Sequence, residues 1–166
     1  IGSPYATYAG VAHLVAHAIF KAGLFLGVGV IDHELGTRDV SKIGSARRTV
    51  PVSVVAIGAC LLSMAGIIPL FGFATKEKAI VALLDAEYGL AGSVALWGVV
   101  AGSVLSVAYS VRLLHALVRT PDDSAVHHEH HESSALMRST LAAPVVVAAV
   151  VSLCFGFAAS TVGSWL

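Results

Sequence analysis

The run SMAGIIPLFGFATKE, residues 63–77, lies inside a long apolar stretch and decides how this chain folds. The whole stretch covers residues 50–84. As one helix it would be about 50 Å long, which is too long for a single membrane crossing without extreme tilt. We therefore expect the helix to break, and the composition of the run places the break near residues 66–73.

Three residues in the run favour an irregular hinge. Pro69 removes a backbone donor and clashes with the preceding helical turn, and Gly66 and Gly72 supply permissive torsions. We predict two half-helices, 50–67 and 74–84, around the hinge. Non-helical backbone at membrane depth is tolerated only inside protein or along a water-filled cavity, so the hinge indicates a functional site. A simple proline kink in one long tilted helix is the alternative.

The composition places the chain among membrane proteins. Of its 166 residues, 57% are hydrophobic and 12% are charged, whereas a soluble domain carries about 25% charged residues. The formal net charge is zero, which removes any argument for nucleic-acid binding. We predict an all-α, polytopic transmembrane bundle of four spans, one of them broken. The spans are expected at residues 5–31, 50–84, 90–117 and 141–166, and the polar loops at 32–49 and 119–138.

Basic residues gather in two of the three connections between the predicted spans. The first loop holds Arg38, Lys42, Arg47 and Arg48, and the third is flanked by Arg112, Arg119 and Arg138. The link between them holds Asp85 and Glu87 and no basic residue. Under the positive-inside tendency, loops 32–49 and 119–138 are predicted to be cytoplasmic. Arg112 lies near the end of its span, where contact with a lipid phosphate or a neighbouring acid is its expected role.

A group of polar residues lies inside the first predicted span. His13, His17 and Lys21 are four residues apart, which places them within an arc of about 80° on one helix face. A lysine in mid-helix costs roughly 2.5–3.5 kcal/mol on membrane-insertion scales, so such residues face a bundle interior or a water-filled path. Imidazoles titrate near neutrality and pass protons between two nitrogens. We predict a proton relay. Hydrogen-bonded packing histidines are the alternative, and no third ligand indicates a metal site.

Lys76 is the second intramembrane candidate because it directly follows the predicted hinge. Its protonation there would respond to desolvation and to the adjacent Glu77, and a proton relay requires such sensitivity. Lys78 lies nearer the end of the span and is expected to anchor at the membrane interface. The same interfacial role is the alternative for Lys76.

Histidines and acids also cluster in the last polar loop, where residues 122–132 read DDSAVHHEHHE. The histidines of segment 127–131 have the composition of a weak zinc or copper site, but a solvated loop is the favoured interpretation. The chain carries no glycine-rich phosphate loop, no cysteine cluster and no nucleophile with an organised base. We therefore expect no metal, no cofactor and no catalytic chemistry in this chain.

Both intramembrane motifs resemble those of antiporter-like membrane subunits. The run HLVAHAIFKAGLFL, residues 13–26, is similar to the family pattern H-x-x-x-H-A-x-F-K-A-x-L-F-L. Residues 63–77 are similar to its S-x-A-G-x-P-P-x-x-G-F-x-x-K-(D/E) break, with Ile68 in place of the first proline. The family includes the A subunit of Mrp-type multisubunit sodium/proton antiporters and the largest antiporter-like subunit of respiratory complex I. The run IDHELGTRD, residues 31–39, resembles the D-H-x-T-G-T-R-D stretch of the Mrp branch, with Leu35 in place of threonine.

The resemblance implies a fold of two inverted repeats, each with a broken helix, of which this chain forms the C-terminal part of the second repeat and a following helix. It also implies that His13, His17, Lys21 and Lys76 belong to a central axis of proton transfer. The partners it implies are other membrane subunits, the lipid of the cell (inner) membrane, protons, and Na⁺ or another monovalent cation. The alternatives are the equivalent proton-pumping subunit of NADH:quinone oxidoreductase and a non-transporting structural membrane module.

Overall fold

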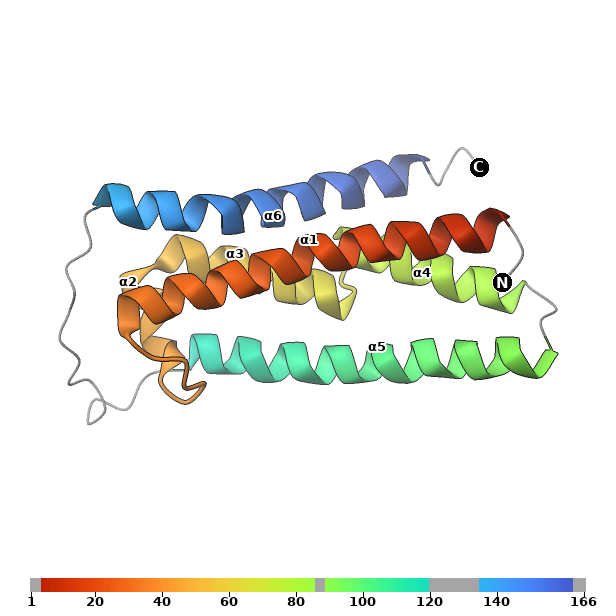
Figure 1. Ribbon diagram of the computed structural model, residues 1–166, viewed down its shortest axis with the longest axis horizontal. Helices are drawn as coiled ribbons and strands as arrows, with labels where there is room; N and C mark the ends of the chain where they lie inside the picture. Colours follow the sequence, from red (N-terminus) through yellow and green to blue (C-terminus); the bar gives the residue numbers. More distant parts are fainter. Residues whose placement is uncertain (1–3, 86–88, 120–134, 163–166) are drawn as a thin grey trace.

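The computed structural model describes residues 4–85, 89–119 and 135–162, and all the regular structure in these ranges is helical (Figure 1). The helices are α1 (Pro4–Leu35), η1 (Ile43–Ser45), α2 (Ala46–Thr49), α3 (Pro51–Ala65), α4 (Phe71–Leu84), α5 (Gly89–Val118) and α6 (Ala135–Val162). Within the described ranges, α1, α5 and the segment Leu136–Ala159 of α6 are long and apolar enough to cross a membrane. The predicted all-α class with one discontinuous helix is confirmed.

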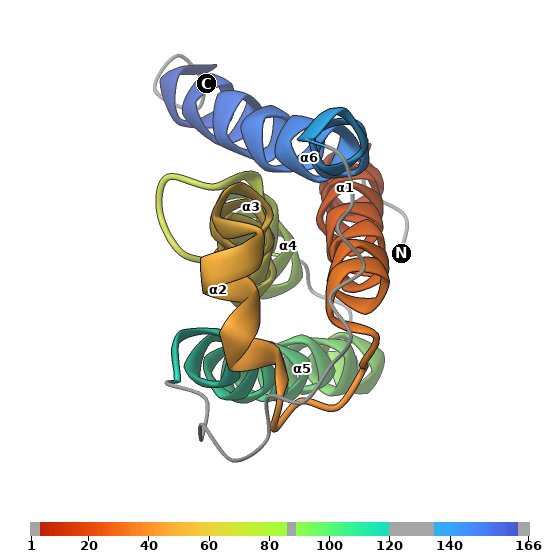
Figure 2. The same ribbon diagram turned by 90° about the vertical axis from the view of Figure 1, so that its left-hand side faces the viewer.

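The broken helix lies in the middle of the bundle. α3 and α4 follow one another along it, and α5 and α6 cover it from opposite sides (Figure 2). α1 packs against α3, α4 and α6, and among the described residues no Cα atom of α1 lies within 8 Å of one in α5. The core between these helices contains the buried side chains of Phe20, Cys60, Leu61 and Val145.

The break between α3 and α4 spans Gly66 to Leu70 and is shorter than predicted. Gly66 has a left-handed backbone, with φ of 85°, and its N–H donates to Leu62 O at 3.1 Å and Ser63 O at 3.0 Å. Ile67 N–H also donates to Leu62 O, which completes a glycine-terminated helix end. Leu70 is extended, and α4 begins at the next residue.

Gly72 does not belong to the hinge, contrary to the expectation from the sequence. It lies in the first turn of α4, where a Cβ atom would stand 1.8 Å from Ser63 O. The absence of a side chain lets the second half-helix pack directly on the end of the first. Gly72 N–H also donates to Ser63 Oγ at 3.2 Å, so the two half-helices are joined by a hydrogen bond.

α6 covers the break from one side. A Cβ atom on Gly156 would stand 1.9 Å from Pro69 O, so the two backbones are in direct contact at this point. The Oγ atoms of Ser63 and Ser152 are 2.7 Å apart and form a buried hydrogen bond between α3 and α6. α6 thus covers the irregular backbone at Pro69, whereas Ile67 and Ile68 of the break are exposed.

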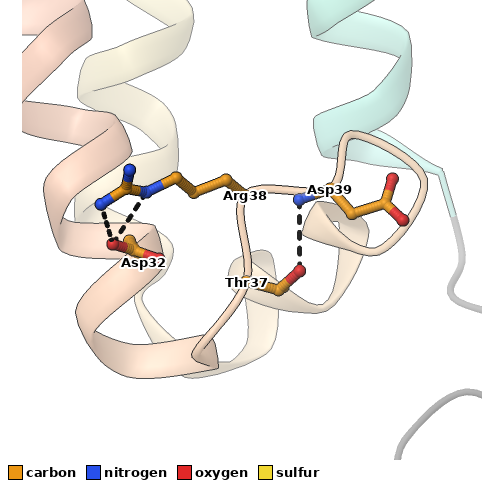
Figure 3. Close-up of polar contacts among 4 residues, drawn as sticks. All are labelled: Asp32, Thr37, Arg38 and Asp39. Carbon is orange, nitrogen blue, oxygen red and sulfur yellow. Dashed lines mark hydrogen bonds and ion pairs between the residues drawn. The ribbon is translucent and has the colours of Figure 1, made fainter.

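α1 continues one turn beyond its predicted end at residue 31. Leu35 is buried, and Gly36, with φ of 63°, follows the last helical residue. Arg38 then folds back and donates to Asp32 Oδ2 from Nε at 3.0 Å and from Nη2 at 2.7 Å (Figure 3). In the next turn, Asp39 N–H donates to Thr37 Oγ1 at 3.2 Å.

The predicted polar loop 32–49 is therefore largely ordered. Besides the last turn of α1 it contains η1 and α2. Asp39 accepts hydrogen bonds from the backbone N–H and the hydroxyl of Ser41, and these two donors lower the pKa of the Asp39 carboxyl.

The ordered loop is tied to both α5 and α6. Arg47 Nη1 donates to Val118 O at 2.9 Å, at the negative end of the α5 dipole. Glu34 is buried at the end of α1, and its Oε2 lies 2.9 Å from Arg138 Nε as an ion pair without hydrogen-bond geometry. Arg138 belongs to α6, which begins at Ala135 and not at the predicted residue 141.

Candidate functional site

Lys76, in the second turn of α4, points its ammonium group at the end of α3. Its Nζ donates to Met64 O at 2.7 Å and lies 3.5 Å from Ala65 O. It also donates to Ser106 Oγ on α5 at 2.7 Å. We call these three atoms the oxygen cage. The two short distances are typical of charge-assisted hydrogen bonds, and the cage therefore solvates an ammonium inside an apolar bundle.

The break makes the two carbonyl oxygens of the cage available. In an uninterrupted helix the carbonyl of Ala65 would accept from the N–H of residue 69, but that residue is a proline and has no N–H. The turn at Gly66 satisfies the carbonyls of Leu62 and Ser63 instead. The last carbonyls of α3 also carry the negative end of its dipole, which favours a cation.

Ser106 supplies the third oxygen, and its other bonds are made within the protein. Its hydroxyl lies 2.8 Å from Ser103 O and 3.3 Å from Met64 O, so its proton has two backbone acceptors and its lone pairs accept from Lys76. No local sequence pattern indicates this role, because a serine in an apolar helix is usually a small packing residue.

His13 contacts the residue next to Lys76. Its Nδ1 lies 3.0 Å from Thr75 Oγ1, and this hydroxyl lies within hydrogen-bond distance of Phe71 O (3.2 Å) and Gly72 O (3.3 Å). When the threonine proton is directed to one of these carbonyls, Oγ1 is free to accept from Nδ1–H of the imidazole. In a neutral ring, that tautomer leaves Nε2 as a proton acceptor.

The other two members of the predicted relay lie along the same helix without a hydrogen-bond partner among the described residues. The ring of His17 is largely exposed and lies 5.1 Å from the ring of Phe20. Lys21 Nζ lies 5.8 Å from the centroid of the Phe25 ring, within range of a cation–π contact. No hydrogen bond in the described ranges joins either of them to Lys76.

Lys21 also borders a cavity of about 120 Å³ between α1, α3 and α5. Apolar side chains such as Leu61 and Leu113 line most of it, and Tyr109 is its other polar side chain. The structure therefore places the two lysines in different surroundings, one against backbone oxygens and one beside an apolar space.

Glu77 and Arg112, the secondary candidates from the sequence, do not contribute to the oxygen cage. Glu77 is exposed and lines a separate groove of about 620 Å³ with Pro69, Lys78 and Gly156. Arg112 is exposed on α5. Within the described part of the chain, neither residue forms an ion pair. The histidine cluster at 127–131 lies outside the described residues, and the described residues contain no group of three potential metal ligands.

A bundle of membrane-length helices around a broken helix, with a lysine held in the break, defines a polytopic membrane protein with a polar site at its centre. Comparison with known proteins gives its family. The family described as NADH:quinone oxidoreductase/Mrp antiporter, transmembrane region, matches residues 1–107, and the chain belongs to it.

Among its relatives is the A subunit of the Na(+)/H(+) antiporter of Bacillus subtilis (strain 168), which is 38% identical over 69% of this chain and 15% of the relative. The A/B subunit of the probable K(+)/H(+) antiporter of Rhizobium meliloti (strain 1021) is 34% identical over 74% of this chain and 13% of the relative. The chain thus spans only a small part of the length of these relatives.

A solved structure shares the fold. The Mrp complex from Dietzia sp. DQ12-45-1b contains a chain that matches with a TM-score of 0.69 and 28% identity, over 93% of this chain and 35% of that chain. The resemblance inferred from the two sequence motifs is therefore confirmed at the level of the family and of the fold.

Proposed function

We propose that this chain is part of a proton-translocating subunit of a multisubunit cation/proton antiporter, in which Lys76 exchanges protons within the membrane. The observation that carries the proposal is the oxygen cage, which holds the Lys76 ammonium at the break in the helix. A lysine in this position has its charge stabilised by three protein oxygens, and its protonation responds to neighbouring charges. The names of the antiporter relatives support the same function.

In this mechanism the polar face of α1 delivers protons toward the broken helix. Lys21, His17 and His13 lie at successive turns of one face, and the imidazole of His13 contacts Thr75, which precedes Lys76. Lys76 then exchanges its proton with one side of the membrane. A change of charge at one member alters the proton affinity of the next, so the coupling is electrostatic and reciprocal.

The proposed partners are the other membrane subunits of such a complex, the lipid bilayer, protons, and Na⁺ or another monovalent cation. We place the chain in the cell (inner) membrane. The end of the bundle that carries Arg38, Arg47 and Arg138 faces the cytoplasm, because basic residues are retained on that side. Glu77 and Arg112 act at the membrane interface and not in the proton path.

The test is the replacement Lys76→Ala in the full-length protein, assayed as proton-gradient-driven sodium exchange in everted membrane vesicles. We expect exchange to be lost while the complex assembles normally. Lys78→Ala is the matched control, since Lys78 lies two residues along the same helix, outside the cage, and should leave exchange unchanged. Normal exchange in Lys76→Ala would indicate that Lys76 is only an interfacial anchor and would overturn the proposal.

A second candidate function is the equivalent subunit of NADH:quinone oxidoreductase, because the family description covers both classes. Flavin and iron–sulfur proteins would then co-purify with the full-length protein, and cation exchange would show no sodium dependence even without a substitution. The third possibility, a structural module, predicts that replacing Lys21 or Lys76 affects stability alone.

A further inference from the structure

The face of α5 that points away from the bundle is apolar for most of its length. α5 contacts α2, α3, α4 and η1 on its other side, and few of its residues are buried. The large side chains of the outward face are 64–82% exposed and recur at helical spacing: Leu90, Val94, Trp97, Val104 and Leu105. From Leu90 to Val111 this face is about 31 Å long at about 1.5 Å per residue, which matches a hydrocarbon core of about 30 Å.

Three basic side chains continue the outward face where its apolar part ends. Arg112 and His115 follow Val94 and Trp97 by 18 residues, which is five full helical turns, so they point in the same direction. Together with Arg119 they lie within an arc of about 60°, and all three are exposed. Arg112 therefore lies at the boundary of the hydrocarbon core, and the other two lie one and two turns further, toward the lipid headgroups.

The segment before α3 brings a fourth basic side chain to the same end of α5 (Figure 2). η1 packs so closely there that a Cβ atom on Gly44 would stand 2.3 Å from Arg119 O. Arg47 follows in α2 and donates from Nη1 to Val118 O at 2.9 Å. This bond fixes the guanidinium at the end of α5, and its other N–H groups form no hydrogen bond within the described residues. We call Arg47, Arg112, His115 and Arg119 the basic patch.

The basic patch has no acidic partner in the described part of the chain. None of its four members forms an ion pair there, whereas Arg38 and Arg138, at the same end of the bundle, pair with Asp32 and Glu34. Residues 90–119 also include no aspartate or glutamate. An exposed cluster of three guanidinium groups therefore stands uncompensated beside an apolar surface.

We propose that the basic patch and the outward face of α5 form a binding site for an anionic phospholipid. The phosphate binds to the guanidinium groups, whose planar forks match phosphate oxygens, and the acyl chains lie along the apolar face. A ligand with a negative charge at one end and a long apolar part is complementary to both parts of this surface. The site lies outside the proton path and adds a lipid ligand to the proposed function.

Binding of radiolabelled phosphatidylglycerol to the purified full-length complex in detergent tests the proposal, with phosphatidylcholine as the neutral comparison. The unmodified complex should prefer phosphatidylglycerol, and binding should weaken as salt rises because the contact is between charges. Arg112→Gln and Arg119→Gln should each weaken the affinity by about fivefold, the effect of one cation near an anionic headgroup. The double variant should bind about 25-fold more weakly.

Arg38→Gln is the matched control, because it removes a positive charge at the same end of the bundle from a guanidinium already paired with Asp32. Its affinity for phosphatidylglycerol should equal that of the unmodified complex. Arg112→Lys keeps the charge and should retain most of the binding, which separates loss of charge from loss of folding. Equal affinities in the double glutamine variant and in Arg38→Gln, or equal binding of the two lipids by the unmodified complex, would overturn the proposal.

Two other results would assign the basic patch to a different ligand and would also overturn the proposal. If inorganic phosphate displaced phosphatidylglycerol at equal concentration, the site would recognise a phosphate ion and not a lipid. If the double glutamine variant lost another subunit but bound phosphatidylglycerol normally, the patch would contact an acidic segment of that subunit. Neither result bears on proton exchange by Lys76, which the Lys76→Ala variant tests separately.

Discussion

Lys21 and Lys76 are the same residue type inside apolar helices of one bundle, yet their ammonium groups have different surroundings. Lys76 Nζ has three protein oxygens within 3.5 Å, two of them from the backbone. Lys21 Nζ lies 5.8 Å from the centroid of the Phe25 ring and borders an apolar cavity. Both side chains are of intermediate exposure, so burial alone does not explain the difference.

The difference comes from the backbone. α1 is continuous over Pro4–Leu35, so the carbonyls around Lys21 are engaged in helical hydrogen bonds. The broken helix instead leaves the last carbonyls of α3 beside Lys76. An ammonium beside a helix break is therefore solvated by protein oxygens. An ammonium on a continuous helix depends on water instead. We infer that Lys76 is where charge is held, and that Lys21 only passes protons.

We expect the largest effect, on stability and on exchange, from adding a side chain where α6 contacts the break. Gly156→Ala places a Cβ atom 1.9 Å from Pro69 O and 2.7 Å from the carbonyl carbon of Leu70, both backbone atoms. Overpacking of this kind destabilises by about 1–3 kcal/mol. The thermal unfolding midpoint of the purified complex should fall, and exchange should fall with it.

Gly98→Ala on α5 is the control for this change, because a Cβ atom there meets no atom of the chain within 4 Å. If Gly156→Ala and Gly98→Ala had the same unfolding midpoint, α6 would not close the break and the cage would not be fixed by packing.

The second effect separates the two lysines. Lys21→Gln removes a proposed proton carrier, and a positioned proton-transfer group contributes roughly 10²–10⁴-fold in rate. We expect the rate of exchange in vesicles to fall by at least about tenfold, since water in the path replaces part of the function. Exchange should not be abolished, because Lys21 does not belong to the oxygen cage that holds the Lys76 ammonium. Complete loss of exchange in Lys21→Gln, as expected for Lys76→Ala, would remove the distinction between the lysines.

The smallest effect is expected at the contact between α1 and α4. Thr75→Val removes the hydroxyl that is hydrogen-bonded to His13 Nδ1 at nearly constant volume, and a hydrogen bond of this kind contributes about 0.5–1.5 kcal/mol. Exchange should slow by about threefold to tenfold. Thr75→Ser keeps the hydroxyl and should restore the rate. Equal rates in both variants would show that the tautomer of His13 is not set by Thr75.

The sequence is sufficient to predict the broken helix and its lysine. Proline and glycine inside an apolar run are local signals, and Lys76 follows them directly. The partners of the site are not predictable in the same way. Ser106 lies 30 residues from Lys76, and Thr75 lies 62 residues from His13, so only the packing of the helices brings each pair together.

The sequence also misplaces Gly72 and two helix ends, because tertiary packing decides these features as well. The sequence predicts Gly72 in the hinge, because a glycine needed for a permissive backbone torsion cannot be told from a glycine needed for close packing by sequence alone. It also ends α1 too early and begins α6 too late, because Asp32 and Arg138 have the character of loop residues. Burial of Leu35 and the ion pair between Glu34 and Arg138 extend both helices, and neither contact is visible in local composition.

The central claim is that Lys76 must lose and regain a proton at the break, and not merely carry a positive charge there. The most direct test is sodium exchange by the full-length protein with Lys76→Arg, since a guanidinium keeps the charge but is not deprotonated in proteins. We predict an assembled complex without exchange, whereas Lys78→Arg exchanges normally. Normal exchange in Lys76→Arg would contradict the claim, because a fixed charge would then be sufficient.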